Sequence, residues 1–268
     1  MSMRVRGTAL ACGATAAYAA ALRPALLSWG ATDTEAATSY PSDELIENAT
    51  SRSTMAASLP APPEAVWPWL VQMGCGRAGW YSWDLFDNGG RSSTDRIVPE
   101  WQDLAVGDRV PTVPSGASYF RVEVLDPGRT LVLRSDLELP SGRSFDPRGA
   151  MPRAYADGIW AFHLHRLPDG CTRLIVRTRG RGVPSMANRL FTWILGEPAH
   201  FIMQHRQFHE LRRRVARREF AHRVRQPHDR AGAGQAGAVE VDGLPGPLHR
   251  RDEVDRLGVR DLGCGRSG

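Results

Sequence analysis

The stretch Ala61-Pro62-Pro63-Glu64-Ala65-Val66-Trp67-Pro68-Trp69-Leu70 predicts a helix that begins directly after a strand. Proline in the first turn of a helix costs no hydrogen bond, and a glutamate there interacts favourably with the helix dipole. The apolar pattern continues to Met73, and three glycines at 74, 76 and 79 then end the helix. Residues 50–59, just before this stretch, are predicted to form the first strand.

Downstream of the helix, the sequence alternates between short strand-like segments and turn residues. Segment 80–88 is predicted as a short helix that ends at Gly89-Gly90. The predicted strands are 109–111, 119–125, 130–135, 159–167 and 172–179. Asp126-Pro127-Gly128 and Pro168-Asp169-Gly170 are typical hairpin turns, whereas 139–157 is rich in proline, glycine and arginine and is predicted as a long loop.

The domain closes with helix. Ser185 is a candidate cap for a helix over 186–195, and Pro198 then opens the last long helix. Four apolar residues of that helix share one face at spacings of 7, 3 and 4: Phe201, Phe208, Leu211 and Val215. A strand, helices, antiparallel strands and a long final helix together predict an α+β fold, with a curved antiparallel sheet laid against one helix.

This order of elements, together with residues 61–70, resembles the SRPBCC superfamily, the START-like group that includes polyketide cyclases and dehydratases. Four further runs are similar to uncharacterised actinobacterial members: Val71-Gln72-Met73-Gly74, Gly79-Trp80-Tyr81-Ser82, Arg96-Ile97-Val98-Pro99-Glu100-Trp101-Gln102-Asp103-Leu104-Ala105-Val106-Gly107-Asp108 and Glu197-Pro198-Ala199-His200-Phe201. The resemblance covers about residues 29–218. It implies a helix-grip fold whose sheet wraps a long C-terminal helix, with an apolar cavity between them.

Alternation along the predicted strands assigns the side chains that face the terminal helix. The predicted inner wall is Phe120, Val122, Val124, Leu131, Leu133, Trp160, Phe162, Leu164, Leu174 and Val176. The predicted ligand-binding set adds Trp69, Trp80, Tyr81, Asp84, His200 and Phe201 to members of this wall. Two interpretations stay open, because these side chains either fill a solid core or line a true ligand cavity.

Two functions fit this pattern, and fold alone does not choose between them. The first is non-catalytic binding of a hydrophobic small molecule of lipid, polyketide or isoprenoid type. The second is a cyclase or dehydratase that moves protons with Tyr81, Asp84 or His200 inside a dry pocket. A carboxylate among aromatic rings suits that chemistry, but we favour the interpretation of Asp84 and Asp87 as helix caps or as partners of Arg91 or Arg96.

No cofactor or metal is predicted. The sequence has 34 arginines and no lysine, which excludes Schiff-base chemistry. Gly74, Gly76 and Gly79 match the dinucleotide-binding string, but they follow a helix instead of a strand. His205 and His209 lack the motif of a zinc protease, and no two cysteines form a CxxC pair, so neither a zinc site nor a disulfide framework is indicated.

The ends of the chain differ from the predicted domain, which spans 50–225. Residues 1–28 contain an alanine-rich run, 8–22, that is shorter than the roughly 20 residues of a membrane span and is a candidate signal or anchor. Residues 29–49 form a polar lead-in, and 226–268 are predicted to be disordered. The eight arginines in 205–225 are interpreted as a solvated helix face, with no nucleic-acid partner. We expect a cytoplasmic protein, with weak membrane association or export through 8–22 as the alternative.

Overall fold

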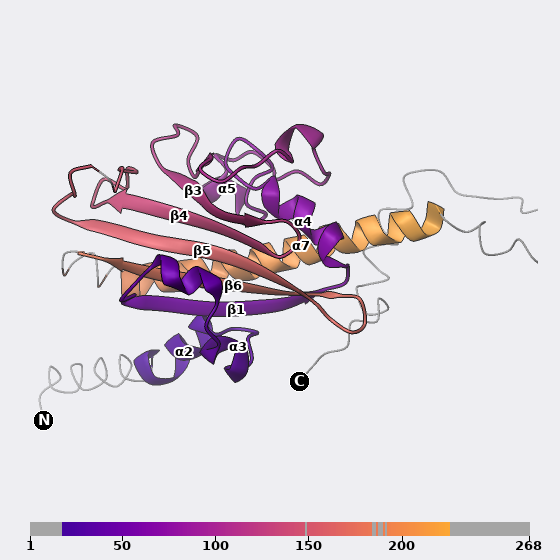
Figure 1. Ribbon diagram of the computed structural model, residues 1–268, viewed down its shortest axis with the longest axis horizontal. Helices are drawn as coiled ribbons and strands as arrows, with labels where there is room; N and C mark the ends of the chain where they lie inside the picture. The colour runs from indigo at the N-terminus through magenta and orange to yellow at the C-terminus, as the bar shows by residue number, and fades with distance from the viewer. Residues whose placement is uncertain (1–17, 148, 184–185, 187–189, 191, 226–268) are drawn as a thin grey trace, which may run out of the picture.

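The computed structural model describes residues 18–147, 149–183, 186, 190 and 192–225. Six strands form one antiparallel sheet in the order β1-β6-β5-β4-β3-β2. Their bounds are β1 (Ser51–Leu59), β2 (Arg109–Pro111), β3 (Tyr119–Asp126), β4 (Thr130–Glu138), β5 (Tyr155–Arg166) and β6 (Thr172–Gly182). The long helix α7 (Glu197–Arg225) crosses one face of this sheet and lies behind it in Figure 1. This is the α+β helix-grip architecture that the sequence predicts.

Helices α4 (Pro63–Val71) and α5 (Asp84–Asp87) close the same side of the sheet as α7. A short 3-10 helix, η3 (Pro99–Trp101), follows them. The predicted helix after the first strand is therefore confirmed, but the helix predicted over 80–88 is confined to four residues. The predicted loop 139–157 begins as expected, after β4 ends at Glu138, but it is shorter because β5 already begins at Tyr155.

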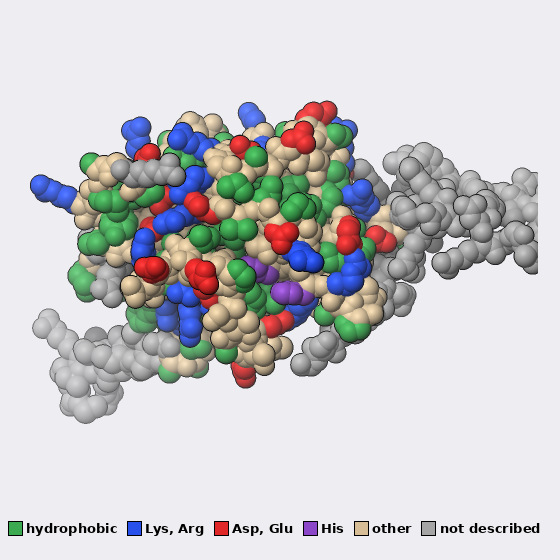
Figure 2. Space-filling view, in the orientation of Figure 1, with side chains coloured by type: hydrophobic (Ala, Val, Ile, Leu, Met, Phe, Trp, Pro, Cys, Tyr) green, Lys and Arg blue, Asp and Glu red, His purple; other side chains and the backbone are tan. Residues whose placement is uncertain are grey.

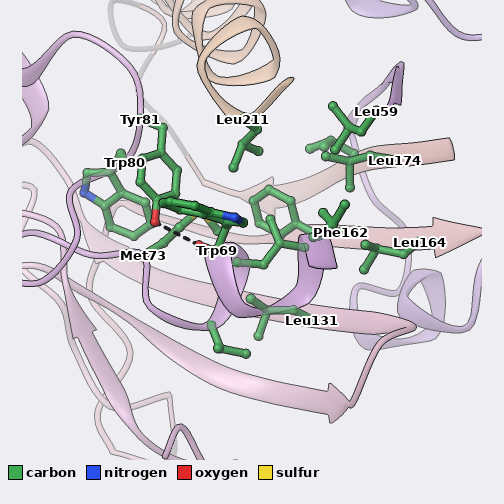
Figure 3. Close-up of a cluster of buried hydrophobic side chains, with 14 of the residues drawn as sticks. Leu59, Trp69, Met73, Trp80, Tyr81, Leu131, Phe162, Leu164, Leu174 and Leu211 are labelled. Carbon is green, nitrogen blue, oxygen red and sulfur yellow. Dashed lines mark hydrogen bonds between the residues drawn. The ribbon is translucent and has the colours of Figure 1, made fainter. Parts of the chain in front are cut away.

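The core lies between the inner face of the sheet and the middle of α7. Leu211 of α7 is fully buried and lies close to Phe162 and Leu174 of the strands, while Trp69 of α4 completes the cluster (Figure 3). Fully burying one side chain of this size contributes roughly 1.5–3 kcal/mol. This contact fixes the position of α7 across the strands.

One residue of the predicted inner wall faces the other way. Val122 pairs with Leu133 and Val124 pairs with Val132, so Glu123 is an extra residue in β3. This β-bulge reverses the alternation beyond it. Val124 consequently packs with Ile46 and Val132 on the outer face, and its assignment to the inner wall is wrong.

The lead-in covers the outer face of the sheet and is more ordered than the sequence indicates. It contains α3 (Asp33–Ala37) and the 3-10 helix η2 (Pro41–Leu45). Tyr40 packs on Ala56 and Ile175, and Ile46 packs on Val132 and Ile159. These contacts make the segment a third layer on the sheet.

A buried ion pair fastens this layer. Both guanidinium nitrogens of Arg177 that face Asp43 donate to its carboxylate, at 3.0 and 2.8 Å. Arg177 is 2% exposed and Asp43 is 9% exposed. Basic and acidic side chains are interspersed over the face of the molecule seen in Figure 2. Arg134 and Arg181 of the sheet likewise form ion pairs with Asp157.

Near the start of α7, the N-terminal helices η1 (Tyr18–Leu22) and α2 (Arg23–Leu27) contact the chain again. Arg23 donates to Glu197 at 2.6 and 2.7 Å. The π-helix η4 (Thr192–Gly196) precedes α7, and much of the predicted helix 186–195 lies outside the described residues. So do most of run 8–22 and the tail 226–268; within the described part of the chain, we find no helix with the length and hydropathy needed to cross a membrane.

Candidate functional site

A cavity of about 480 Å³ lies between the inner face of the sheet and the first turns of α7. It has an aromatic side, formed by Trp80, Phe120 and Trp160. The three rings touch one another, with centroids 5.5–5.7 Å apart. The opposite side consists of residues from α7 and from the region around α5: His200, Met203, Gln204, Gln207, Ser82 and Asp87.

The cavity exists because one row across the sheet carries almost no side chain. Ser51, Gly180, Gly158 and Ser135 are successive cross-strand partners on β1, β6, β5 and β4, and all four line the cavity. Two rows further along the strands, the corresponding partners are Met55, Val176, Phe162 and Leu131, which are buried in the core. Large side chains fill the space under the middle of α7, whereas small ones leave it open under its first turns.

The two amide side chains of α7 that line the cavity, Gln204 and Gln207, are already hydrogen-bonded to other groups of the protein. Trp160 donates its indole N–H to Gln204 at 3.1 Å, and Gln204 donates to Gln207 at 2.9 Å. Gln207 in turn donates to the backbone carbonyl of Trp80 at 2.9 Å. This chain of hydrogen bonds fixes both tryptophans of the aromatic wall.

Asp87 is the carboxylate of the cavity, and it has no partner. The residue is 9% exposed, and neither carboxylate oxygen accepts a hydrogen bond from the described residues. Burial raises the pKa of Asp87, and the nearby charge of Asp84 raises it further. The Ser82 hydroxyl is near enough to offset part of this shift in pKa, but it donates to the Met203 carbonyl at 3.2 Å.

His200 contributes the second unpartnered group. Its side chain is partly exposed, but the Nε2 atom is buried and has no hydrogen-bond partner. Burial lowers the pKa of His200 to about 4, so the imidazole is neutral at pH 7. A neutral imidazole nitrogen either donates or accepts one hydrogen bond, according to its tautomer.

The structure divides the predicted ligand-binding set into three groups. Trp80, Phe120, Trp160 and His200 line the cavity. Eight others lie in the packed core beyond it: Trp69, Tyr81, Val122, Leu133, Phe162, Leu164, Leu174 and Val176. Phe201 and Asp84 lie outside both the cavity and this core cluster. Phe201 packs against the Trp29 ring, at 6.3 Å between centroids, and lines a surface groove with Trp83, Ile202 and His205.

Tyr81 and Asp84 have structural roles outside the cavity. The Tyr81 hydroxyl accepts from Gln72 at 2.8 Å and donates to the Trp69 carbonyl at 3.1 Å, as the dashed line in Figure 3 marks. Burial strongly raises the pKa of Tyr81. Asp84 accepts from the backbone N–H and the hydroxyl of Ser93, at 2.9 and 2.5 Å, instead of pairing with an arginine.

Sequence reasoning missed several residues that line the cavity. Asp87 was interpreted as a cap or an ion-pair partner, and the small row at 51, 135, 158 and 180 gave no signal within any single strand. Gln204 and Gln207 are three apart on α7, a spacing that places them on one helix face and was the available clue.

The remaining reactive side chains lie elsewhere. His205 shares the surface groove with His209, on the side of α7 away from the cavity. No group of three or more histidine, cysteine or acidic side chains placed to hold a metal ion is found among the residues that the structure describes. Cys75 is a buried free thiol, whereas Cys171 is disulfide-bonded, a bond that the spacing of the cysteines does not indicate.

No protein-family model and no curated protein matches the chain. Among solved structures, a Mesorhizobium loti protein, MLL2253, is 18% identical over 62% of this chain and 98% of its own, with a TM-score of 0.36. Protein CV1439 of Chromobacterium violaceum is 18% identical over 61% and 96%, with a TM-score of 0.33. CalU16 of Micromonospora echinospora is 14% identical over 65% and 86%, with a TM-score of 0.29. At these values the likeness carries no argument about activity, and the helix-grip assignment rests on the sheet order and on the position of α7.

Proposed function

We propose that the protein binds a hydrophobic small molecule, of lipid, polyketide or isoprenoid type, in the cavity between its sheet and α7. The single observation that supports this most is the row of glycine and serine side chains at 51, 180, 158 and 135. Protein interiors are normally close-packed, with few voids larger than a water molecule. A row of small residues opposite the start of α7 keeps about 480 Å³ open at a place where larger apolar residues would stabilise the core.

The size and the lining of the cavity support the same proposal. Small-molecule sites usually measure about 300–1,000 Å³ and combine apolar walls with a few placed polar groups. Here the walls are Trp80, Phe120 and Trp160, and the placed polar groups include Asp87 and His200. The SRPBCC fold generally binds hydrophobic ligands, which agrees with this arrangement.

The cyclase or dehydratase alternative gains no specific support. Of its three candidate groups, Tyr81 and Asp84 lie outside the cavity and are committed to other hydrogen bonds. The third, His200, is a neutral imidazole at pH 7, and its Nε2 atom has no hydrogen-bond partner among the described residues. We therefore propose binding without catalysis.

A fluorescent apolar probe tests the proposal. N-phenyl-1-naphthylamine is uncharged, and its emission rises when it leaves water, so titration with the protein should give a saturable increase. The substitution Ser135→Phe places a ring in the small row. We expect it to weaken probe binding at least tenfold, which corresponds to about 1.4 kcal/mol.

The matched control is Ser115→Phe, the same change at an exposed position of the turn between β2 and β3, whose own side chain does not line the cavity. It should leave the probe affinity within twofold of the wild type. The proposal is overturned if the wild type shows no saturable signal, or if Ser135→Phe binds the probe as tightly as Ser115→Phe does.

A further inference from the structure

Some polar side chains around the cavity already have hydrogen-bond partners within the protein, whereas others do not. Gln204 and Gln207 are occupied by each other and by the two tryptophans. Thr178 is bonded to Ser53 at 2.6 Å. Asp87 and His200 are different, because both present buried polar atoms that lack any partner within the described chain.

One further lining residue, Arg179, has a buried polar atom without a partner, but its guanidinium lies on the outer face of the sheet. The Nε atom of Arg179 is unpartnered, but its neighbours Thr178 and Gly180 are the residues of β6 that face α7. The Arg179 guanidinium lies on the outer face, where it contacts Asp43 at 3.3 Å and the Ile46 carbonyl at 3.3 Å. Among the described residues, the buried side-chain atoms that face the cavity without a hydrogen-bond partner are therefore those of Asp87 and His200.

Asp87 determines that a ligand group placed here must donate a hydrogen bond. An ionised carboxylate only accepts hydrogen bonds, and leaving it buried without a donor is costly. Its surroundings compensate only in part: Ser82 and nearby backbone N–H groups lower the pKa of Asp87, but burial and the negative charge of Asp84 outweigh them and raise it. A ligand group that donates to Asp87 relieves this cost, whereas a ligand carboxylate increases it.

We propose that the ligand of this cavity is an apolar molecule with a hydroxyl or amine group that donates to Asp87, and that acids are rejected. This inference rests on the proposed binding function and names its ligand class. His200 provides the second contact, since its neutral Nε2 atom can complement the same polar end of the ligand. The apolar remainder of the molecule lies against Trp80, Phe120 and Trp160.

Four naphthalene compounds that differ in one substituent test the inference. Isothermal titration calorimetry is performed with 2-naphthol, 2-naphthylmethylamine, 2-methoxynaphthalene and 2-naphthoate. The naphthol and its methyl ether differ only in the donor hydrogen and one methyl group. We expect the naphthol and the amine to bind at least about tenfold more tightly than the ether does. Naphthoate should bind most weakly of the four.

Asp87→Leu should reduce the naphthol-to-ether affinity ratio to within about twofold of one, because the acceptor is gone. Asp87→Asn keeps an acceptor oxygen but removes the charge, so it should retain the naphthol preference and lose the extra affinity for the amine. Asp95→Leu is the matched control; it removes a like charge from an exposed loop and should leave every ratio unchanged.

The outcomes separate the two proposals. If N-phenyl-1-naphthylamine binds but the wild type shows no donor preference, or if Asp87→Leu keeps that preference, the inference about Asp87 is overturned and the binding function stands. If neither the probe nor any of the four compounds binds, the binding function fails and the inference fails with it.

Discussion

Two buried aspartates with the same exposure should respond to the same substitution in opposite directions. Asp43 and Asp87 are each 9% exposed. Asp43 accepts two hydrogen bonds from Arg177 and lies 3.3 Å from Arg179, whereas Asp87 accepts none. We expect Asp43→Leu to destabilise the protein and Asp87→Leu to stabilise it.

The magnitudes follow from what each change leaves behind. Asp43→Leu strands the guanidinium of Arg177, which is 2% exposed, and breaking a buried ion pair in this way costs about 3–5 kcal/mol. Asp87→Leu removes a buried acceptor that has no donor, and such a group costs about 1–3 kcal/mol. The two variants should therefore differ by at least 4 kcal/mol or so in their free energy of unfolding.

Urea denaturation of both variants and the wild type, followed by circular dichroism at pH 7, measures these free energies. For a chain of this size, 1 kcal/mol corresponds to roughly 2–4 °C in Tm, so thermal melts give an independent reading. Destabilisation by Asp87→Leu of more than about 1 kcal/mol would show that its carboxylate has a structural partner, and the reasoning about the cavity would be wrong.

Two further predictions concern buried polar side chains. The pKa of His163 is lowered to about 4 by burial, so only the unfolded chain takes up its proton as the pH falls from about 6.5 to 4. The wild type should lose about 2–3 kcal/mol more than His163→Gln over that interval, and parallel curves of unfolding free energy against pH would contradict this. Gln204→Leu leaves the indole N–H of Trp160 and the side-chain oxygen Oε1 of Gln207 unpaired, so it should cost about 1–3 kcal/mol in urea denaturation; a neutral effect would contradict the hydrogen-bond chain.

Much of the fold can be predicted from the sequence, because strand and helix periodicity are local properties. The helix opened by Pro62-Pro63, all six strands and the long final helix lie close to their predicted positions. The β-bulge at Glu123 could not be predicted, since nothing in the sequence of β3 alone shows how its residues pair with β4. The regular structure of the lead-in could not be predicted for a related reason. Its polar residues are expected to be exposed unless it is known that Arg177 of β6 lies opposite Asp43.

The site was predicted only in part, because sequence reasoning searched for large apolar side chains. That search finds Trp80, Phe120 and Trp160, but it cannot separate a cavity wall from the core that continues beside it. What separates them is the cross-strand row that contains Gly158 and Gly180, and this row depends on the register of four strands. Asp84 and Asp87 are both plausible in the sequence; the short extent of α5 leaves the first beside Ser93 and the second at the cavity.

Crystals grown with 6-bromo-2-naphthol offer the most direct measurement, because the anomalous signal of bromine locates the compound without prior assumptions. The expected result is one strong peak inside the cavity, among Gly158, Trp160 and His200, with the naphthol oxygen within hydrogen-bond distance of Asp87. An empty cavity, or a peak only in the surface groove beside Trp83 and Phe201, would contradict the proposal that this protein holds its ligand between sheet and helix.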